Sequence, residues 1–178
     1  RPVNDPPTLD IAAVANSQVP EDTNLALPGI SVDDAVDAVY APVTLRVTLQ
    51  AAHGTIHVNP NLAPGLGTGN ITGNGSTRVV LTGTPAAINR TLASPLGVVY
   101  RGDLDYNDFN TDSDPDPDEG IVVTVDDRGN VGAGGAMQTQ GTIVVNVTPV
   151  NDPPKITSPG AQGLDEDDPD FYIPIIVE

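Results

Sequence analysis

The chain contains a series of short segments in which apolar and polar residues alternate or branched aliphatic residues follow one another. Within residues 43–50, Val43, Leu45, Val47 and Leu49 alternate with threonine, arginine and glutamine. Successive side chains of a strand point to opposite faces, so this alternation predicts a strand with one buried face. Similar segments occur at 9–14, 25–32, 54–59, 77–83, 96–100, 120–125 and 141–148. Clusters of Gly, Pro, Asn and Asp separate them, which predicts an all-β fold, an antiparallel Greek-key β-sandwich.

One short helix interrupts this pattern. Thr84 is suited to cap its N-terminus, Pro85 to occupy its first turn, and residues 86–94 to continue it. The stretch 61–76 is rich in Gly, Asn and Thr, and it predicts a flexible loop or the tip of a hairpin.

The pentapeptide Val-Asn-Asp-Pro-Pro occurs twice, at residues 3–7 and 150–154, and the residues that follow each copy also match loosely. A repeat at this distance indicates tandem modules, each a complete domain. The prolines favour an extended, stiff backbone, which is typical of a linker between domains. We therefore expect a linker from a preceding repeat at 1–7, one domain at 8–149, a linker at 150–154 and the start of the next repeat at 155–178.

The amino-acid composition limits the kind of core, metal site and binding partner that the chain can have. Only six of the 178 residues are aromatic, so the core has to be built from branched aliphatic side chains. There is no cysteine, which excludes disulfides and thiolate metal sites. The net charge of −17 disfavours binding to nucleic acid or to anionic membranes. No apolar run approaches the ~20 residues that span a bilayer, and residues 1–5 do not resemble a signal peptide, so we expect any export signal or anchor to lie outside this fragment.

The acidic residues gather in the predicted loops. They occur at Glu21 and Asp22, at Asp33, Asp34 and Asp37, at Asp103, Asp105, Asn107 and Asp108, in the run 112–119, at Asp126 and Asp127, and at Asn151 and Asp152. Calcium takes six to eight oxygen ligands in flexible geometry, and loops at one end of a sandwich converge to supply them. Gathered carboxylates repel one another without a cation. The set predicts Ca²⁺ binding; the alternative is a solvated acidic surface.

Several motifs carry a family resemblance. Residues 120–154 resemble the closing half of a cadherin repeat, residues 104–107 resemble its middle acidic loop, and residues 20–22 resemble the Pro-Glu-Asn that follows its first strand. Still more similar is the cadherin-like repeat of large bacterial surface and adhesin proteins, which shares VNDPP, EDT, SVDD, HGTI, LTGTPAAIN, VDDRGN and GGA. The resemblance covers nearly all of 3–154 and implies a cadherin/Ig-like sandwich. The acidic run 112–119 departs from it, because a short turn is usual there.

The resemblance also implies where the metal ligands lie. One group is expected to meet at the junction with the following repeat: Glu21, Asp103, Asp105, Asn107, Asn151 and Asp152, next to Asp22. A second group is expected at the junction with the preceding repeat: Asn4, Asp5, Asp33, Asp34 and Asp126. Calcium at these junctions would stiffen a chain of modules into a rod.

The expected function is that of a calcium-stiffened spacer in a long extracellular adhesin or surface filament, located at the cell surface. Its expected partners are neighbouring repeats of the same chain, with lateral self-association or a cell-surface ligand as further possibilities. The alternative is a calcium-dependent glycan-binding module, for which the run 112–119 is the candidate site. An enzyme is not expected, since there is no tryptophan platform, phosphate-binding loop or nucleophile elbow.

Overall fold

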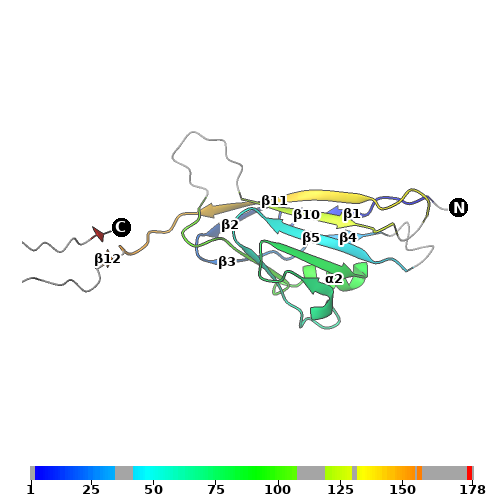
Figure 1. The fold of residues 1–178 in the computed structure, drawn as a ribbon, viewed down its shortest axis with the longest axis horizontal. Coiled ribbons are helices and arrows are strands. Elements are labelled where there is room, and N and C mark those ends of the chain that lie inside the picture. The colour runs from blue at the N-terminus through cyan, green and yellow to red at the C-terminus, as the bar shows by residue number, and fades with distance from the viewer. Residues whose placement is uncertain are drawn as a thin grey trace, which may run out of the picture.

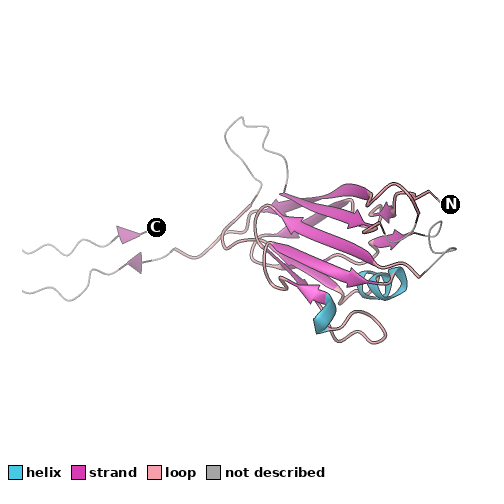
Figure 2. Cartoon of the chain, turned by 45° about the vertical axis from the view of Figure 1, so that its right-hand side comes forward, coloured by secondary structure: helices cyan, strands magenta, loops and turns pink. Residues whose placement is uncertain are grey.

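The structure is a computed structural model that describes residues 3–34, 42–107, 119–129, 132–154, 156–157 and 176–177. These residues form an all-β sandwich with one short α-helix, as predicted. Figure 2 shows the strands as the body of the domain with the helix at its flank. Within the described part of the chain, no helix has the length and apolar character needed to cross a bilayer.

The larger layer is a six-stranded sheet. Its spatial order is β2 (Asn16–Pro20), β11 (Gln138–Thr148), β10 (Glu119–Asp126), β5 (Leu45–Ala51), β8 (Arg78–Gly83) and β7 (Ile71–Thr72). The pairs are antiparallel except for β2 with β11, which run parallel. Strand β5 therefore lies beside β10, far away in sequence, as Greek-key connections require.

The second layer consists of two smaller sheets. One has the order β3 (Asn24–Ala26), β9 (Val98–Arg101) and β6 (Thr55–Val58), and the other pairs β1 (Thr8–Asp10) with β4 (Ser31–Asp33). Beyond the sandwich, β12 (Ile156–Thr157) pairs with β13 (Ile176–Val177). The helix α2 (Pro85–Leu92) packs beside β4, and a 3-10 turn, η1 (Thr68–Asn70), precedes β7.

The core lies between the layers and is almost entirely aliphatic. In β5, Leu45, Val47 and Leu49 are buried on the predicted face while Arg46 and Gln50 are exposed. Tyr100 is the largest of the fully buried side chains, and its hydroxyl donates to the His53 carbonyl at 2.8 Å. The predicted helix is confirmed, since the Thr84 side chain accepts a hydrogen bond from Ala87 N.

Two predicted strands are wrong in their extent. The segment 9–14 leaves the sheet after Asp10, whose side chain accepts from Ala12 N and so forms a turn. The segment 25–32 is divided into β3 and β4, because Gly29 takes a left-handed φ of 97° directly after Pro28. The predicted loop 61–76 contains η1 and β7. Strand β2 was not predicted, since its sequence is mostly polar.

Two asparagines close the edges of the smaller sheets. The Asn89 amide accepts from Val32 N and donates to Val32 O, both at 2.8 Å, so α2 is tied to β4. Asn74 makes the same pair of bonds with Val58 on β6, at 2.7 and 2.8 Å. Each amide satisfies backbone groups that a further strand would otherwise pair.

The chain passes through the sandwich from end to end. Strand β1 begins close to one end of the long axis and β11 runs to the opposite end (Figure 1). We call these ends the N-terminal pole, where Val3 to Pro7 meet the domain, and the C-terminal pole, where the chain leaves after Thr148.

We expect Asn89→Ala to lower the free energy of unfolding by about 2 kcal/mol, because two hydrogen bonds to one strand residue are lost at about 1 kcal/mol each. Urea unfolding of the full chain measures the effect. The matched control is Asn146→Ala on the exposed face of β11, for which we expect a change within about 0.5 kcal/mol. Equal losses in the two variants would contradict the role assigned to Asn89.

Candidate metal centre

Glu21 is the residue around which the C-terminal pole is organised. It directly follows β2, and its backbone N–H donates to Thr148 O at 2.8 Å, which continues the pairing with β11. Its side chain is 5% exposed. The carboxylate accepts from Val150 N at 2.6 Å and from the Asn107 amide at 3.0 Å. Glu21 therefore joins the end of β2, the loop after β9 and the segment 150–154 after β11, for which we keep the name linker.

Three further carboxylates gather beside this junction. Oxygens of Asp22, Asp105 and Asp152 all lie within 4.8 Å of one another. Each comes from a different segment: the turn after β2, the loop after β9 and the linker. Asp22 and Asp105 both adopt left-handed backbone conformations, with φ of 58° and 59°, which aspartate tolerates better than most residues. Asp105 N also donates to Asp22 Oδ1 at 3.4 Å.

This cluster has dimensions that suit a calcium ion. Calcium binds oxygen at 2.3–2.6 Å, so two oxygens on one ion lie at most about 5.2 Å apart. The observed limit of 4.8 Å satisfies this condition. Three carboxylates provide hard oxygen donors, which Ca²⁺ and Mg²⁺ prefer to nitrogen or sulfur. Asp22 is half-buried and the other two acids are exposed, so water could complete the coordination.

The other ligands expected at this pole have different contacts. Asn107 is engaged with Glu21. Asp103 is exposed and lies outside the cluster, and its backbone carbonyl accepts from Tyr106 N at 3.2 Å. Asn151 is also exposed, and its amide donates to Asp152 O at 3.4 Å. The structure thus brings together Asp22, Asp105 and Asp152, with Glu21 and Asn107 as their support.

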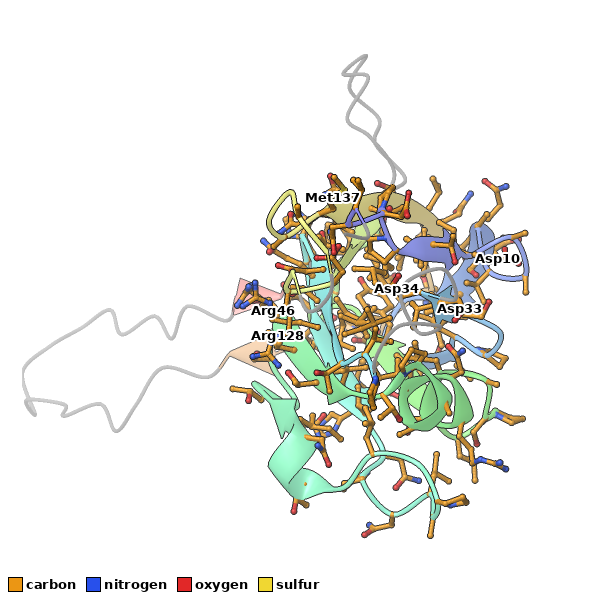
Figure 3. All side chains as sticks on the ribbon, turned by 90° about the vertical axis from the view of Figure 1, so that its right-hand side faces the viewer. Asp10, Asp33, Asp34, Arg46, Arg128 and Met137 are labelled. Atoms are coloured by element: carbon orange, nitrogen blue, oxygen red, sulfur yellow. The ribbon has the colours of Figure 1, made fainter. Side chains whose placement is uncertain are left out.

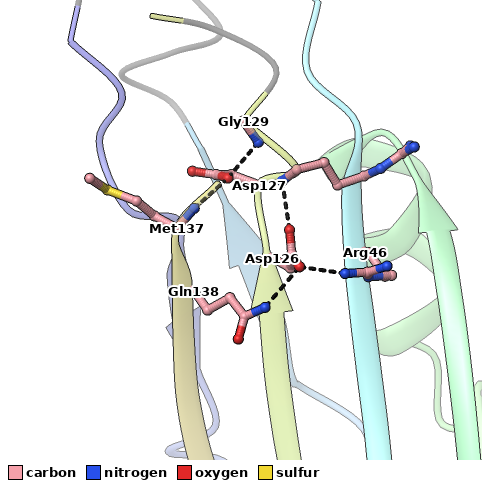
Figure 4. A network of polar contacts seen from close by, with 7 residues as sticks. Arg46, Asp126, Asp127, Gly129, Met137 and Gln138 are labelled. Atoms are coloured by element: carbon pink, nitrogen blue, oxygen red, sulfur yellow. Dashed lines mark hydrogen bonds and ion pairs between the residues drawn. The ribbon is translucent and has the colours of Figure 1, made fainter. Parts of the chain in front are cut away.

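At the N-terminal pole, Asn4 docks on a buried aspartate. Its side-chain amide donates to Asp127 Oδ2 at 2.5 Å and to Gly135 O at 3.0 Å. Asn4 is 2% exposed and Asp127 is 0% exposed. The second oxygen of Asp127 accepts from Gly129 N and Met137 N, both at 2.8 Å (Figure 4). The Asn4 Oδ1 atom is buried without a hydrogen bond, so it remains available to a cation or a water molecule.

Asp126 makes different contacts from its neighbour. It forms an ion pair with Arg46 at 2.6 Å and accepts from Gln138 Nε2 and Arg128 N (Figure 4). Burial alone would raise the pKa of Asp126, but the bonds from Arg46, Gln138 and Arg128 outweigh it, and the pKa lies below its ordinary value. The expected ligand Asp126 is thus directed to Arg46, and Asp127 takes the place beside Asn4.

The period of the strand could have identified Asp127. Ile121, Val123 and Val125 point into the core, and the alternation places residue 127 on the same side. Residue 126 belongs to the outer series with Val122 and Thr124.

The other acids expected at the N-terminal pole are Asp5, Asp33 and Asp34. Asp33 Oδ1 accepts from Asp34 N at 2.8 Å, Asp34 is buried and Asp5 is exposed. Figure 3, which looks onto this pole, shows Asp33 and Asp34 on one side and Arg46 and Arg128 on the other. Among the described residues, these acids do not form a second group with the spacing of the C-terminal cluster. Asp37, Asp108 and residues 112–118 lie outside the described residues, so of the alternative glycan site 112–119 only Glu119, the first residue of β10, is described.

Comparison of the chain with protein-family models, curated proteins and solved structures finds no match. The interpretation of the site therefore depends on its own geometry and on the sequence motifs.

We expect Glu21→Ala to destabilise the domain by about 3 kcal/mol, because two hydrogen bonds to a buried carboxylate are lost. Glu21→Gln should lose less, since one acceptor oxygen remains. Urea unfolding measures the loss, and amide exchange at Val150 reports whether the linker is released. Unchanged exchange at Val150 in the alanine variant would contradict the assigned contact.

We expect Asp126→Asn to cost on the order of 1 kcal/mol at neutral pH, since Arg46 is half-exposed and water screens the pair. A carboxyl with a lowered pKa contributes stability above its ordinary pKa of 3.8 and loses it as the pH falls through the folded-state value. The difference between variant and parent should therefore shrink below pH 3.8. Arg46→Gln should give the same pH profile. A difference independent of pH would contradict the ion pair.

Proposed function

We propose that this chain is a repeat module of a long extracellular adhesin or surface filament, in which calcium stiffens the joint between modules. The observation that carries the proposal is the cluster of Asp22, Asp105 and Asp152. Two of these residues belong to the domain and the third belongs to the linker. A cation shared by them would fix the direction in which the linker leaves the domain.

The repeated pentapeptide and the path of the chain support a tandem arrangement. Copies of Val-Asn-Asp-Pro-Pro stand at both boundaries of the domain. The chain approaches one pole and leaves from the other (Figure 1), so successive domains would follow one another as a rod. Neighbouring repeats are thus the proposed partners, and the module acts as a spacer rather than as an enzyme.

The protein's own residues prepare the joint before any cation binds. Glu21 holds the Val150 N–H, which brings Asp152 beside the loop of Asp105. Calcium would supply positive charge and flexible oxygen coordination at this point. Without a cation, carboxylates about 4 Å apart repel one another by about 1 kcal/mol per pair in water. That repulsion would favour a looser linker.

The proposed extracellular location is consistent with this chemistry. Extracellular calcium modules bind with dissociation constants of about 10⁻⁴ to 10⁻³ M, which suits a small site with exposed ligands. The acidic surface, with a net charge of −17, also suits a solvated filament. The two poles have different proposed roles. The C-terminal cluster binds the cation of the joint. At the N-terminal pole, the buried Asn4 Oδ1 offers one oxygen ligand to a second cation.

We expect calcium to raise the melting temperature of the full chain. At a hundredfold excess over Kd the stabilisation is about 2.7 kcal/mol, which for a chain of this length corresponds to roughly 5–10 °C. Differential scanning calorimetry in EDTA, in magnesium and in calcium measures the shift, and calcium should give the larger effect.

Asp152→Asn and Asp105→Asn should each reduce this calcium-dependent shift by at least about half, because each removes one of three charged ligands. Asp10→Asn is the matched control, since it removes the same charge from an exposed position outside the cluster and keeps the turn acceptor. If the shift survives unchanged in Asp105→Asn and Asp152→Asn, the cluster is not the site.

A further inference from the structure

We propose that the exposed Asn151 docks into a second copy of this domain in the same way that Asn4 docks into this one. We call an asparagine that docks in this way a plug. The proposal rests on the tandem arrangement proposed above. It assigns the partner of the C-terminal pole: a domain that presents a buried aspartate in a glycine-rich loop of the kind formed here by residues 127–129 and 132–137.

The docked copy of the pentapeptide shows how the plug is held. Val3 forms a parallel bridge with Ala133, and Asn4 N donates to Ala133 O at 3.1 Å. The Asn4 side chain reaches Asp127 and Gly135. A little further along, Thr139 Oγ1 donates to Pro7 O at 2.5 Å. Backbone and side-chain bonds therefore fasten the same short segment.

The loop is shaped for a closely approaching backbone. A Cβ atom on Gly132 would lie 2.5 Å from Asn4 N and 2.7 Å from Val3 C, and Gly132 has a left-handed φ of 84°. A larger residue at position 132 would displace the plug.

The two hydrogen-bond acceptors at this docking site favour an asparagine side chain. Asp127 Oδ2 and Gly135 O are both acceptors, so the partner atom has to be a double donor, which an amide nitrogen is. Asp127 uses its other oxygen for two backbone N–H groups of its own loop. An aspartate in place of Asn4 would set a carboxylate against a carboxylate.

The second copy of the pentapeptide presents its asparagine to solvent. Residues 151–154 are all exposed, and Asn151 makes a long local bond to Asp152 O. Val150 N is held by Glu21. Consecutive residues would then be fixed by consecutive domains: residue 150 by the domain before and Asn151 by the domain after.

The two copies also divide their charges in a complementary way. Asp5 is exposed, whereas the neighbouring Asn4 is buried in the domain. Its counterpart Asp152 contributes to the acidic cluster of the domain that precedes it. Within one linker, the asparagine thus belongs to the following domain and the aspartate to the preceding one.

The test is the full chain lengthened by a second copy of residues 8–154 inserted after Pro154, compared with the 178-residue chain. Residue-resolved amide exchange is measured in EDTA and in calcium. We expect Asn151 N–H to exchange at least about tenfold more slowly in the lengthened chain. Asn4 N–H, protected in both chains, is the internal control.

Asn151→Ala should remove most of the protection gained at Asn151 in the lengthened chain, and Asn151→Asp should remove more. Asn4→Ala should lower the melting temperature of the 178-residue chain while Asn151→Ala leaves it unchanged.

Fast exchange at Asn151 in the lengthened chain, alongside a protected Asn4, would overturn the plug. Equal protection in EDTA and in calcium, with no calcium effect on melting, would support the plug and refute the calcium proposal. A calcium-dependent melting shift with an unprotected Asn151 in both solutions would refute the plug alone.

Discussion

Buried carboxylates at the two poles organise this domain, because a buried charge is stable only where protein donors replace water. Glu21 and Asp127 obtain those donors in the same way. Glu21 accepts from one backbone N–H and Asp127 from two, and each also accepts from one asparagine amide: Asn107 for Glu21, and Asn4 for Asp127. In each case the asparagine comes from a segment distant in sequence. The carboxylate therefore determines where a loop and a linker meet the sandwich.

The sandwich supplies the rigidity that these contacts need. Strands β2 and β11 end side by side, so Glu21 and the start of the linker lie on the same edge of the sheet. Strands β10 and β11 are joined by the loop that receives Asn4. Strand β11 thus extends from the loop that receives Asn4 to the start of the linker, so one paired strand connects the two poles.

Sequence patterns predicted most of the sheet, and the three acids of the C-terminal cluster were all among the expected ligands. The exceptions have identifiable causes. Alternating aliphatic residues indicated β5, β8, β10 and β11, and the cap at Thr84 indicated the helix. Strand β2 lacks such alternation because it is a polar edge strand, and the breaks after Asp10 and at Gly29 depend on local turns. At the site, the expected division of acids between two poles was implied by the resemblance to cadherin repeats. Side-chain direction decides that Asp22 and not Asp103 belongs to the cluster, and that Asp127 and not Asp126 bonds to Asn4. The period of the strand could have indicated this for Asp127, but no sequence signal indicated it for Asp22.

The acids of this domain have two physical roles that the structure separates. Glu21 and Asp127 are buried and hydrogen-bonded, so the fold itself depends on their charges being compensated from within. Asp105 and Asp152 are exposed at the cluster, where solvent screens them and where a cation can be added or removed. In the proposed joint, loss of calcium would therefore loosen the connection between modules without unfolding them. In the proposed filament, stiffness would then change with the ionic composition of the surroundings while every module stays folded.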